Sequence, residues 1–439
     1  MGFRGSLLLF LYGAVGWAQT GPPLSAEVNA AYPQAQTLYV DLHQHPELSS
    51  HEVNTAAKIA SQLRQLGYEV TEHVGGTGVV AILRNGAGPT VMLRTELDAL
   101  PVEEKTGLPY ASKVTATNDA GLTVPVMHAC GHDLHMAALV GTAEIMARSK
   151  GQWQGTLMLI GQPAEETVGG ASGMLADGLF TRFPKPNYAI ALHTTNNLPA
   201  GKIGITPEYA RSNADTVNIT VYGKGGHGAR PETTVDPIVI AARTILALQT
   251  IVSREIKPGD PAVITIGYIR GGTKNNIIPD EVHLGLTVRS FTTPTRKHLL
   301  SAIQRVAAAE AEAAGAPRPP LVQVTESADA VYNDPKLAER LTIVLGRALG
   351  AANVEQIPPE MVSEDFSAYV EAGVPSQYVT LGAADPVKFK EAEAGGVQLP
   401  SNHSPYYAPD VEPSLKTAME AEVAILRNLL AKESGGGAK

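Results

Sequence analysis

The chain has 439 residues, of which 44% are hydrophobic, and a formal net charge of -9 at pH 7. This length exceeds what one hydrophobic core normally serves, so we expect two domains. The acidic balance and the lack of a basic block argue against nucleic acid as a partner, because phosphate binding requires clustered Lys and Arg. A small molecule is the better expectation.

Residues 1–18 have the pattern of a cleavable export signal. Arg4 precedes an apolar run over 7–15, and the small residues Gly16 and Ala18 flank a cleavage point. The pattern predicts a periplasmic or secreted protein that begins near Gln19 and keeps no membrane anchor, because the run is short. The alternative is an amphipathic start to the first domain. We expect no other segment of transmembrane length.

Short apolar runs in residues 19–210 predict a mostly parallel sheet that is covered on both faces. The runs are 78–83, 90–94, 156–160 and 188–192, with a helix over 135–147. Polar side chains follow three of these strands, namely Glu96 and Asp98, Glu165 and Glu166, and His193. In open α/β sheets the ligand site lies beyond the carboxyl ends of the strands, so we expect these side chains in one cleft.

Residues 211–327 change character and predict an inserted domain. The expected strands are 215–222, 262–269, 281–290 and 321–325, and the expected helices are 235–252 and 296–314. The order β-α-β-β-α-β is that of a ferredoxin-like sandwich. Residues 328–432 return to the first domain, with helices at 336–349 and 413–432 and a strand at 377–381, and 433–439 form a disordered tail.

Cys130 is the only cysteine, so it cannot form a disulfide within the chain. A buried structural thiol is the simplest alternative. However, Cys130 lies beside glycine and between His128 and His132, which is unfavourable for an apolar core. A thiolate, imidazoles and the Glu165-Glu166 pair are what a borderline transition metal and a hydrolytic base require. The pattern therefore predicts a metal-dependent hydrolase.

Several motifs together carry a family resemblance. They are Arg94-Thr-Glu96-Leu-Asp98-Ala-Leu-Pro101, His128-Ala-Cys130-Gly-His132-Asp133-Leu-His135, Gln162-Pro-Ala-Glu165-Glu166, Gly225-Gly-His227-Gly-Ala-Arg-Pro231, Gly271-Gly-Thr-Lys-Asn-Asn276, Ser363-Glu364-Asp365-Phe366 and Asn402-His403-Ser-Pro405. In order and spacing they resemble the aminoacylase-like metallopeptidases, in the subgroup of hippurate hydrolase and plant auxin-conjugate hydrolase. The resemblance implies an α/β catalytic domain of zinc-exopeptidase type, interrupted by a ferredoxin-like lid and dimerisation domain.

The resemblance also implies the metal site and the base. Cys130 would bridge two divalent metal ions, which could be zinc, manganese, cobalt or nickel. The remaining metal ligands would be His132, Glu166, His193 and His403. Glu165 would be the catalytic base.

Further roles follow from the same resemblance. His227 would hydrogen-bond the scissile carbonyl, in related dimers that of the partner's cleft, while Asn276 and Arg289 would hold the substrate carboxylate. Asp98 would orient a metal ligand. Glu96 stands where the family usually has a shorter aspartate, so it is expected to alter rate or specificity rather than metal binding.

Other histidines receive supporting roles or none. We interpret His128 and His135 as packing or orienting residues, and we leave His43 and His45 outside the site. We expect the specificity pocket to be built from scattered residues around Tyr209, Met361 and Leu381.

The resulting hypothesis is an exported amidohydrolase that cleaves N-acyl or N-aroyl amino acids, or a C-terminal peptide bond, with a metal-activated water. Alternatives are an N-acetyldiaminopimelate-type deacetylase, a dipeptide carboxypeptidase, or an inactive metal-binding homologue, against which the intact Glu165 and Cys130 argue. We expect a homodimer through the inserted domain, with a tetramer as a further option. A monomer with a closing lid is the alternative.

Overall fold

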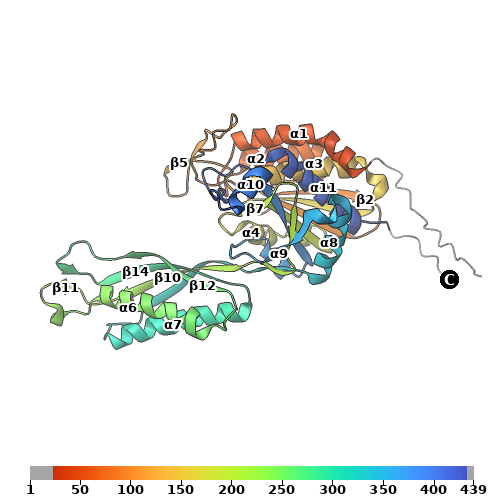
Figure 1. Ribbon diagram of the computed structural model, residues 1–439. Helices are drawn as coiled ribbons and strands as arrows, with labels where there is room; N and C mark the ends of the chain where they lie inside the picture. The colour runs from red at the N-terminus through yellow and green to blue at the C-terminus, as the bar shows by residue number, and fades with distance from the viewer. Residues whose placement is uncertain (1–22, 433–439) are drawn as a thin grey trace, which may run out of the picture.

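The computed structural model describes residues 23–432, so the predicted signal and the predicted tail lie outside the described residues. These residues form two lobes, and the smaller lobe extends away from the larger one (Figure 1). The larger lobe contains residues from both ends of the described chain, and the smaller lobe is formed by its middle. The chain therefore passes through the junction between the lobes twice.

The larger lobe is built on an eight-stranded sheet with the order β1-β2-β6-β3-β7-β18-β8-β17. Its centre is parallel and consists of β3 (Thr90–Glu96), β6 (Gly155–Gln162), β7 (Tyr188–Pro199) and β18 (Ser376–Ala384). The strands β1 (Glu69–Thr71), β2 (Val79–Asn85), β8 (Ile203–Ile205) and β17 (Val354–Gln356) complete it. The predicted α/β fold with a mostly parallel sheet is confirmed.

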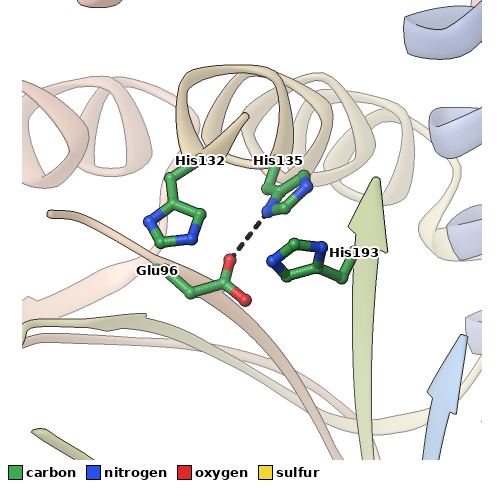
Figure 2. A group of neighbouring side chains, drawn as sticks. All are labelled: Glu96, His132, His135 and His193. Atoms are coloured by element: carbon green, nitrogen blue, oxygen red, sulfur yellow. Dashed lines mark hydrogen bonds and ion pairs between the residues drawn. The ribbon is translucent and has the colours of Figure 1, made fainter. Parts of the chain in front are cut away.

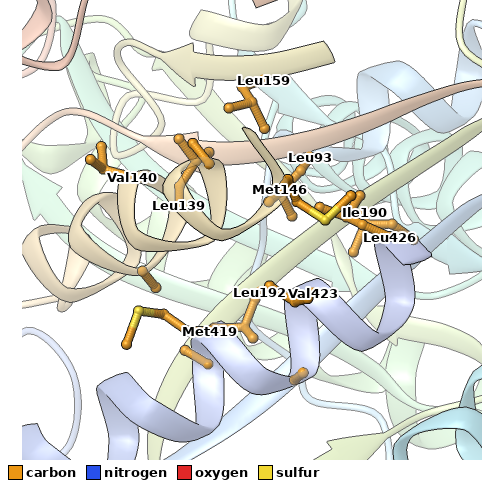
Figure 3. Close-up of a cluster of buried hydrophobic side chains, with 14 of the residues drawn as sticks. Leu93, Leu139, Val140, Met146, Leu159, Ile190, Leu192, Met419, Val423 and Leu426 are labelled. Carbon is orange, nitrogen blue, oxygen red and sulfur yellow. The ribbon is translucent and has the colours of Figure 1, made fainter. Parts of the chain in front are cut away.

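Helices cover both faces of this sheet because successive strand residues point to opposite sides. Leu93 packs on one side, against α1 (Leu24–Gln44), α2 (Val53–Gln65), α3 (His132–Arg148), α8 (Pro335–Leu349) and α11 (Val411–Leu429). Figure 3 shows part of this core, in which α3, with Leu139 and Met146, lies beside α11, with Met419 and Leu426. Met92 packs on the other side, against α4 (Gly170–Ala176), α5 (Leu179–Arg182) and α9 (Ser367–Glu371).

The smaller lobe is a four-stranded antiparallel sheet with two helices on one face. Its strands are β10 (Asn213–Tyr222), β12 (Ala262–Arg270), β14 (Glu281–Ser290) and β15 (Leu321–Ala328), and its helices are α6 (Pro237–Thr250) and α7 (Thr293–Ala313). The sheet order β12-β14-β10-β15 is that of the ferredoxin-like sandwich. Aspartate and threonine N-caps begin the two helices, since Asp236 accepts from Ile238 N and Thr292 accepts from Thr295 N.

One expectation about membrane segments was wrong. Among residues 23–432, the helical stretch Pro237–Glu255 is long and apolar enough by composition to cross a membrane, and 33% of it is buried. It includes α6 and packs on the inserted sheet, so its composition alone is weak support for a membrane span. The sequence predicts a helix over 235–252 but assigns it to the inserted domain.

The remaining elements connect the two lobes or lie at the surface. They are β4 (Thr115–Thr117), β5 (Thr123–Pro125), β9 (Glu208–Arg211), β11 (Gly226–His227), β13 (Ile277–Ile278), β16 (Val331–Asn333) and α10 (Pro386–Glu393), with short turns of 3₁₀ or π helix between them. The strands β9 and β16 pair at the junction between the lobes.

Candidate metal and catalytic site

The predicted metal ligands converge from separate parts of the catalytic domain. Cys130 and His132 lie at the start of α3, Glu166 follows β6, His193 lies within β7, and His403 lies in the loop before α11. A cavity of about 590 Å³ is lined by four of these residues, with His132 buried beside them. Side chains up to 273 positions apart in sequence therefore meet, because parallel strands end at the same edge of the sheet.

Distances between the donor atoms fit metal coordination. Cys130 Sγ lies 3.4 Å from His193 Nε2. Two ligands of one tetrahedral ion, with bonds of about 2.3 Å to sulfur and about 2.0 Å to nitrogen, lie about 3.5 Å apart. Cys130, His132 and Glu166 form a second group, whose donor atoms all lie within 4.8 Å of one another. Cys130 belongs to both groups, which suits a bridging ligand.

Unpartnered buried atoms mark the same place. His132 Nε2 and Glu166 Oε1 have no hydrogen-bond partner although both are buried, and 4.0 Å separates them. The other carboxylate oxygen of Glu166 lies 3.3 Å from His403 Nε2. Buried polar atoms without partners are costly. A cation between these donors would satisfy them, so the donor set fits a dinuclear metal centre.

Backbone geometry at three positions aims these ligands. Gly131, between two ligands, has φ +85°, and a Cβ there would lie 2.5 Å from Thr194 Oγ1, so only glycine fits. His403 has φ 68° and Ala164, directly before the Glu165-Glu166 pair, has φ 51°. Non-glycine residues rarely adopt such angles, and they do so most often where function requires it.

The site carries excess negative charge. Burial, reinforced by Glu166 and Glu165, raises the pKa of the Cys130 thiol well above its ordinary value. Burial also raises the pKa of Glu166 to about 7. At His132, burial is outweighed by the hydrogen bond to Asp98 and by nearby carboxylates, which raise its pKa to about 10. Each shift indicates a place where positive charge is favoured.

Asp98 orients both sides of this centre. Its backbone oxygen accepts a hydrogen bond from His132 Nδ1 at 2.8 Å, which leaves Nε2 to face Glu166. Its carboxylate accepts from Glu166 N at 3.0 Å and from Ser49 Oγ at 2.7 Å. These contacts support the predicted role of Asp98 as a residue that orients metal ligands.

Glu96 and His135 lie beside the predicted ligands His132 and His193 (Figure 2). Thr194 N donates to His135 Nε2 at 2.9 Å, so His135 Nδ1 carries the proton and donates to Glu96 Oε2, also at 2.9 Å. Both ring nitrogens of His135 are thus engaged. Although Glu96, His132, His135 and His193 cluster closely enough to suggest a metal site of their own, His135 has no lone pair left for an ion.

Buried arginine and carboxylates form a network beside the base. Arg94 Nη2 donates to Glu364 Oε1 at 2.7 Å and to Asp365 Oδ1 at 3.0 Å, and Arg94 also contacts Glu96. The carboxylate oxygens of Glu165, Glu364 and Asp365 lie within 4.8 Å of one another. Burial and these neighbours raise the pKa of Glu165 well above its ordinary value. This environment suits a carboxylate that accepts and returns a proton.

The predicted catalytic residue His227 and the predicted substrate-binding residue Asn276 lie far from this cavity. His227 and Asn276 are exposed and adjacent, since Gly228 N donates to Asn276 O at 2.9 Å and β11 pairs with β13. They occupy the outer end of the inserted domain (Figure 1). Arg289, by contrast, lines the cavity and donates from Nη1 to Met361 O at 3.1 Å.

Sequence reasoning misplaced part of the pocket. Met361 lines the cavity, but Tyr209 and Leu381 do not. Tyr209 packs on Phe291 and Tyr332, and Leu381 is buried in the main core. The strand containing Leu381 reaches the site, but alternation points that side chain toward the helices instead.

Sequence reasoning also missed residues that border the site. Arg211, Glu360 and Tyr378 line the cavity, and the segment containing Glu364 was noticed without a role. A signal was present for Glu364, because a Glu-Asp pair before an aromatic residue is unusual on a solvated surface. Arg211 carried no local signal. Its position at the end of β9 is apparent only from the tertiary structure.

Comparisons with known proteins agree with this geometry. Residues 92–427 match the model of "Peptidase family M20/M25/M40". The hippurate hydrolase of Campylobacter jejuni is 36% identical over 75% of this chain and 83% of its own length. Thermostable carboxypeptidase 1 of Saccharolobus solfataricus is 36% identical over 79% of this chain and 85% of its own length.

A solved structure agrees as well. The crystal structure of a Bacillus subtilis protein described as a dinuclear metal binding peptidase of the M20 family is 28% identical, with a TM-score of 0.74 over 92% of this chain and 99% of that one. The chain belongs to the peptidase family M20/M25/M40. It is therefore a hydrolase of amide bonds.

Proposed function

We propose that the protein is an exported enzyme that cleaves the amide bond of N-acyl or N-aroyl amino acids, or a C-terminal peptide bond, and releases a free amino acid. One observation carries this proposal. The soft and hard donors of Cys130, His193, His132 and Glu166 meet at metal-binding distances, directly beside Glu165. The named activities of the hippurate hydrolase and the carboxypeptidase support it, since both release an amino acid from an amide.

Two divalent ions fit these donors. Cys130 would serve both ions, with His132, Glu166, His193 and His403 as the other ligands, and this mixture of sulfur, nitrogen and oxygen admits zinc, manganese, cobalt or nickel. When bound, the ions supply a nucleophilic hydroxide at neutral pH and polarise the amide carbonyl.

Glu165 would move the proton. Its Oε2 lies 3.9 Å from His132 Nε2, so its carboxylate borders the donor cluster without belonging to it. From there it would take a proton from the attacking water and give it to the departing amine. Glu364 and Asp365 lie beside this carboxylate and are themselves bound by Arg94, and they favour a proton on Glu165.

Arg289 would hold the substrate's free carboxylate. It lines the cavity and is half-buried, and its one hydrogen bond among the described residues goes to a neutral backbone carbonyl. No carboxylate of residues 23–432 forms an ion pair with it. A guanidinium with free donors in a partly desolvated cavity is well suited to a carboxylate ligand.

We also propose that the enzyme is a homodimer in which His227 and Asn276 of each subunit complete the site of the other. Both are exposed and lie at the end of the inserted domain that is far from their own cavity (Figure 1). The edge strand β12 is paired on one side only. Beside it, α6 exposes Ile238, Val239 and Leu246, the last being 71% exposed. Such edges and apolar faces are commonly covered by a second copy.

The Glu165→Gln variant tests the hydrolytic mechanism. The metal-loaded variant should lose turnover of N-acyl amino acids by about a thousandfold or more, because the amide cannot accept a proton. Its metal content should stay near that of the wild type. Glu326→Gln, in the same cavity but distant from the donors, serves as the control and should change the rate little. Undiminished turnover in Glu165→Gln would show that the base is misassigned.

Mixed subunits test the shared site. Glu165→Gln and His227→Ala should each be inactive alone, but after subunit exchange a heterodimer has one site with both functional residues. An equal mixture should therefore regain about a quarter of the wild-type activity, since half of the dimers carry one complete site of two. No recovery despite confirmed exchange would place His227 at its own subunit's site.

Export is tested separately, by finding a mature N-terminus near Gln19.

A further inference from the structure

A second guanidinium, besides that of Arg289, borders the cavity. Arg211 ends β9, where the chain passes from the catalytic domain into the inserted one, and it lines the same cavity as the metal-binding side chains. Only 4% of its side chain is exposed. Burying a charge is costly unless the charge is paired and hydrogen-bonded, so the partners of its N–H donors matter.

The Tyr378 ring contacts both Arg211 and the predicted metal ligand His193. Its guanidinium lies 4.9 Å from the centre of the Tyr378 ring, and that ring stacks with the His193 imidazole at 6.1 Å. The Tyr378 hydroxyl donates to Glu364 Oε2 at 3.1 Å, which fixes the ring. Arg211 is therefore held in position beside the reacting end of the cavity.

The protein contacts of Arg211 do not use all of its donors. Nη1 carries the ion pair with Glu360 Oε2 at 2.6 Å and a long contact to Ala210 O at 3.4 Å. A guanidinium has five N–H donors. The N–H groups of Nε and Nη2 therefore have no hydrogen-bond acceptor among the described residues, and they can face Tyr378 or the cavity. Glu360 is itself held from the other side, because Asn197 Nδ2 donates to its Oε1 at 3.1 Å.

The two guanidiniums border the same end of the cavity. Arg211 pairs with Glu360, and Arg289 donates to the carbonyl of the next residue, Met361. Consecutive Cα atoms are about 3.8 Å apart, so both arginines bind neighbouring points of one loop. A substrate whose α-carboxylate lies on Arg289 would therefore lie beside the loop to which Arg211 is also bound.

We propose that Arg211 is a specificity-determining residue and that the enzyme prefers N-acyl amino acids whose side chain ends in a carboxylate. The inference rests on the proposed function and narrows its substrate class. A carboxylate would accept the remaining N–H donors in a charge-assisted hydrogen bond, while an apolar side chain would leave them unpaired. Sites built to hydrogen-bond a substrate group strongly reject analogues that lack it.

The experiment compares kcat/KM of the metal-loaded enzyme for N-acetyl-glutamate, N-acetyl-glutamine and N-acetyl-methionine. The three share acyl group and α-carboxylate and have similar length. We expect the glutamate derivative to exceed the methionine derivative by roughly ten- to a hundredfold, with the glutamine derivative between them, because hydrogen bonds to charged groups are stronger than neutral ones. In Arg211→Met this ratio should fall to about one, and Arg211→Lys should keep part of it.

The ratio separates a specificity role from a structural one. If Arg211 merely ties β9 to the loop at Glu360, its replacement lowers all three rates together and leaves the ratio unchanged, which would overturn the inference. Arg289→Met is the matched control, since it should lower all three alike through the shared α-carboxylate. Equal wild-type rates on the three substrates would also overturn the inference while the proposed function stands. Failure of the wild type to hydrolyse these three substrates and also their N-benzoyl and dipeptide counterparts would overturn both.

Discussion

In the catalytic domain most of the chemistry-bearing side chains are buried and held by several contacts, whereas His227 and Asn276 of the inserted domain are exposed and lie away from the cavity that Arg289 lines. His132 is fixed by Asp98, and His135 by Glu96 and Thr194. His227 and Asn276 lie on a two-stranded tip with no buried partner among the described residues. The difference is consistent with the proposal that one chain supplies the metal ligands while a second copy supplies His227 and Asn276.

The largest effect is expected in the catalytic domain, from the substitution of a predicted metal ligand. Cys130→Ser replaces the shared sulfur with a weaker hydroxyl donor, so metal bound per subunit should fall below two and activity by about a hundredfold or more. Elemental analysis and kinetics measure both quantities. Glu165→Gln, which alters no ligand, is the control. A variant that still holds two ions would refute the bridging role.

The Leu246→Arg variant on α6 tests whether the inserted domain forms the proposed dimer contact. A charge on the exposed apolar face should halve the molecular mass in solution and lower activity about tenfold or more, because His227 would no longer reach a partner. Val387→Arg is the matched control, since Val387 on α10 is 66% exposed but lies in the catalytic domain. Identical masses for wild type and Leu246→Arg would exclude this face as the interface.

A smaller effect is expected from Glu96→Asp. The shorter carboxylate cannot contact Arg94 and His135 together, so the hydrogen-bonded path through Thr194 to the ligands should loosen. We expect kcat/KM to fall by about tenfold or less, with metal content unchanged. Glu96→Gln keeps the length of the side chain but loses its charge. It therefore distinguishes the effect of side-chain length from the effect of charge. Loss of metal in Glu96→Asp would mean that Glu96 acts on binding itself.

The smallest effect concerns Glu422, a buried carboxylate on α11 that takes no part in the proposed chemistry. Burial raises the pKa of Glu422 to about 8, and its described partner is the hydroxyl of Thr142, which donates to it at 2.7 Å. Because the folded pKa lies above the unfolded one, the stability from this group is complete below about pH 4.5 and is lost as pH rises through about 8.

Glu422→Gln should remove this pH dependence. Relative to the wild type, its Tm should rise steadily from about pH 5 to about pH 8 and then stay level. Thermal unfolding across that range measures the difference, with Glu412→Gln on the same helix, where the side chain is 62% exposed, as a control for surface effects. A constant difference in Tm at all pH values would show that Glu422 does not titrate in the folded protein.

Much of the fold was accessible from residue patterns. The continuous apolar runs predicted the central strands, and alternation with two long helices predicted the inserted sandwich. The first helices, α1 and α2, were not predicted. Their apolar faces become evident only when the core they cover is known, since Pro33 interrupts α1 and polar residues separate the apolar positions of α2.

The sequence by itself determined the chemistry of the site, because residue types and their order after strands decide which donors can converge at one sheet edge. Cys130, Glu165 and the flanking histidines were identifiable in this way. Only the tertiary structure decided which side chains reach the cavity and in which direction each one points. It placed Arg211 beside Tyr378, turned Leu381 into the core and carried His227 away from its own cavity. Such outcomes depend on strand register and domain placement, which are set by packing between segments hundreds of residues apart and leave no local trace in the chain.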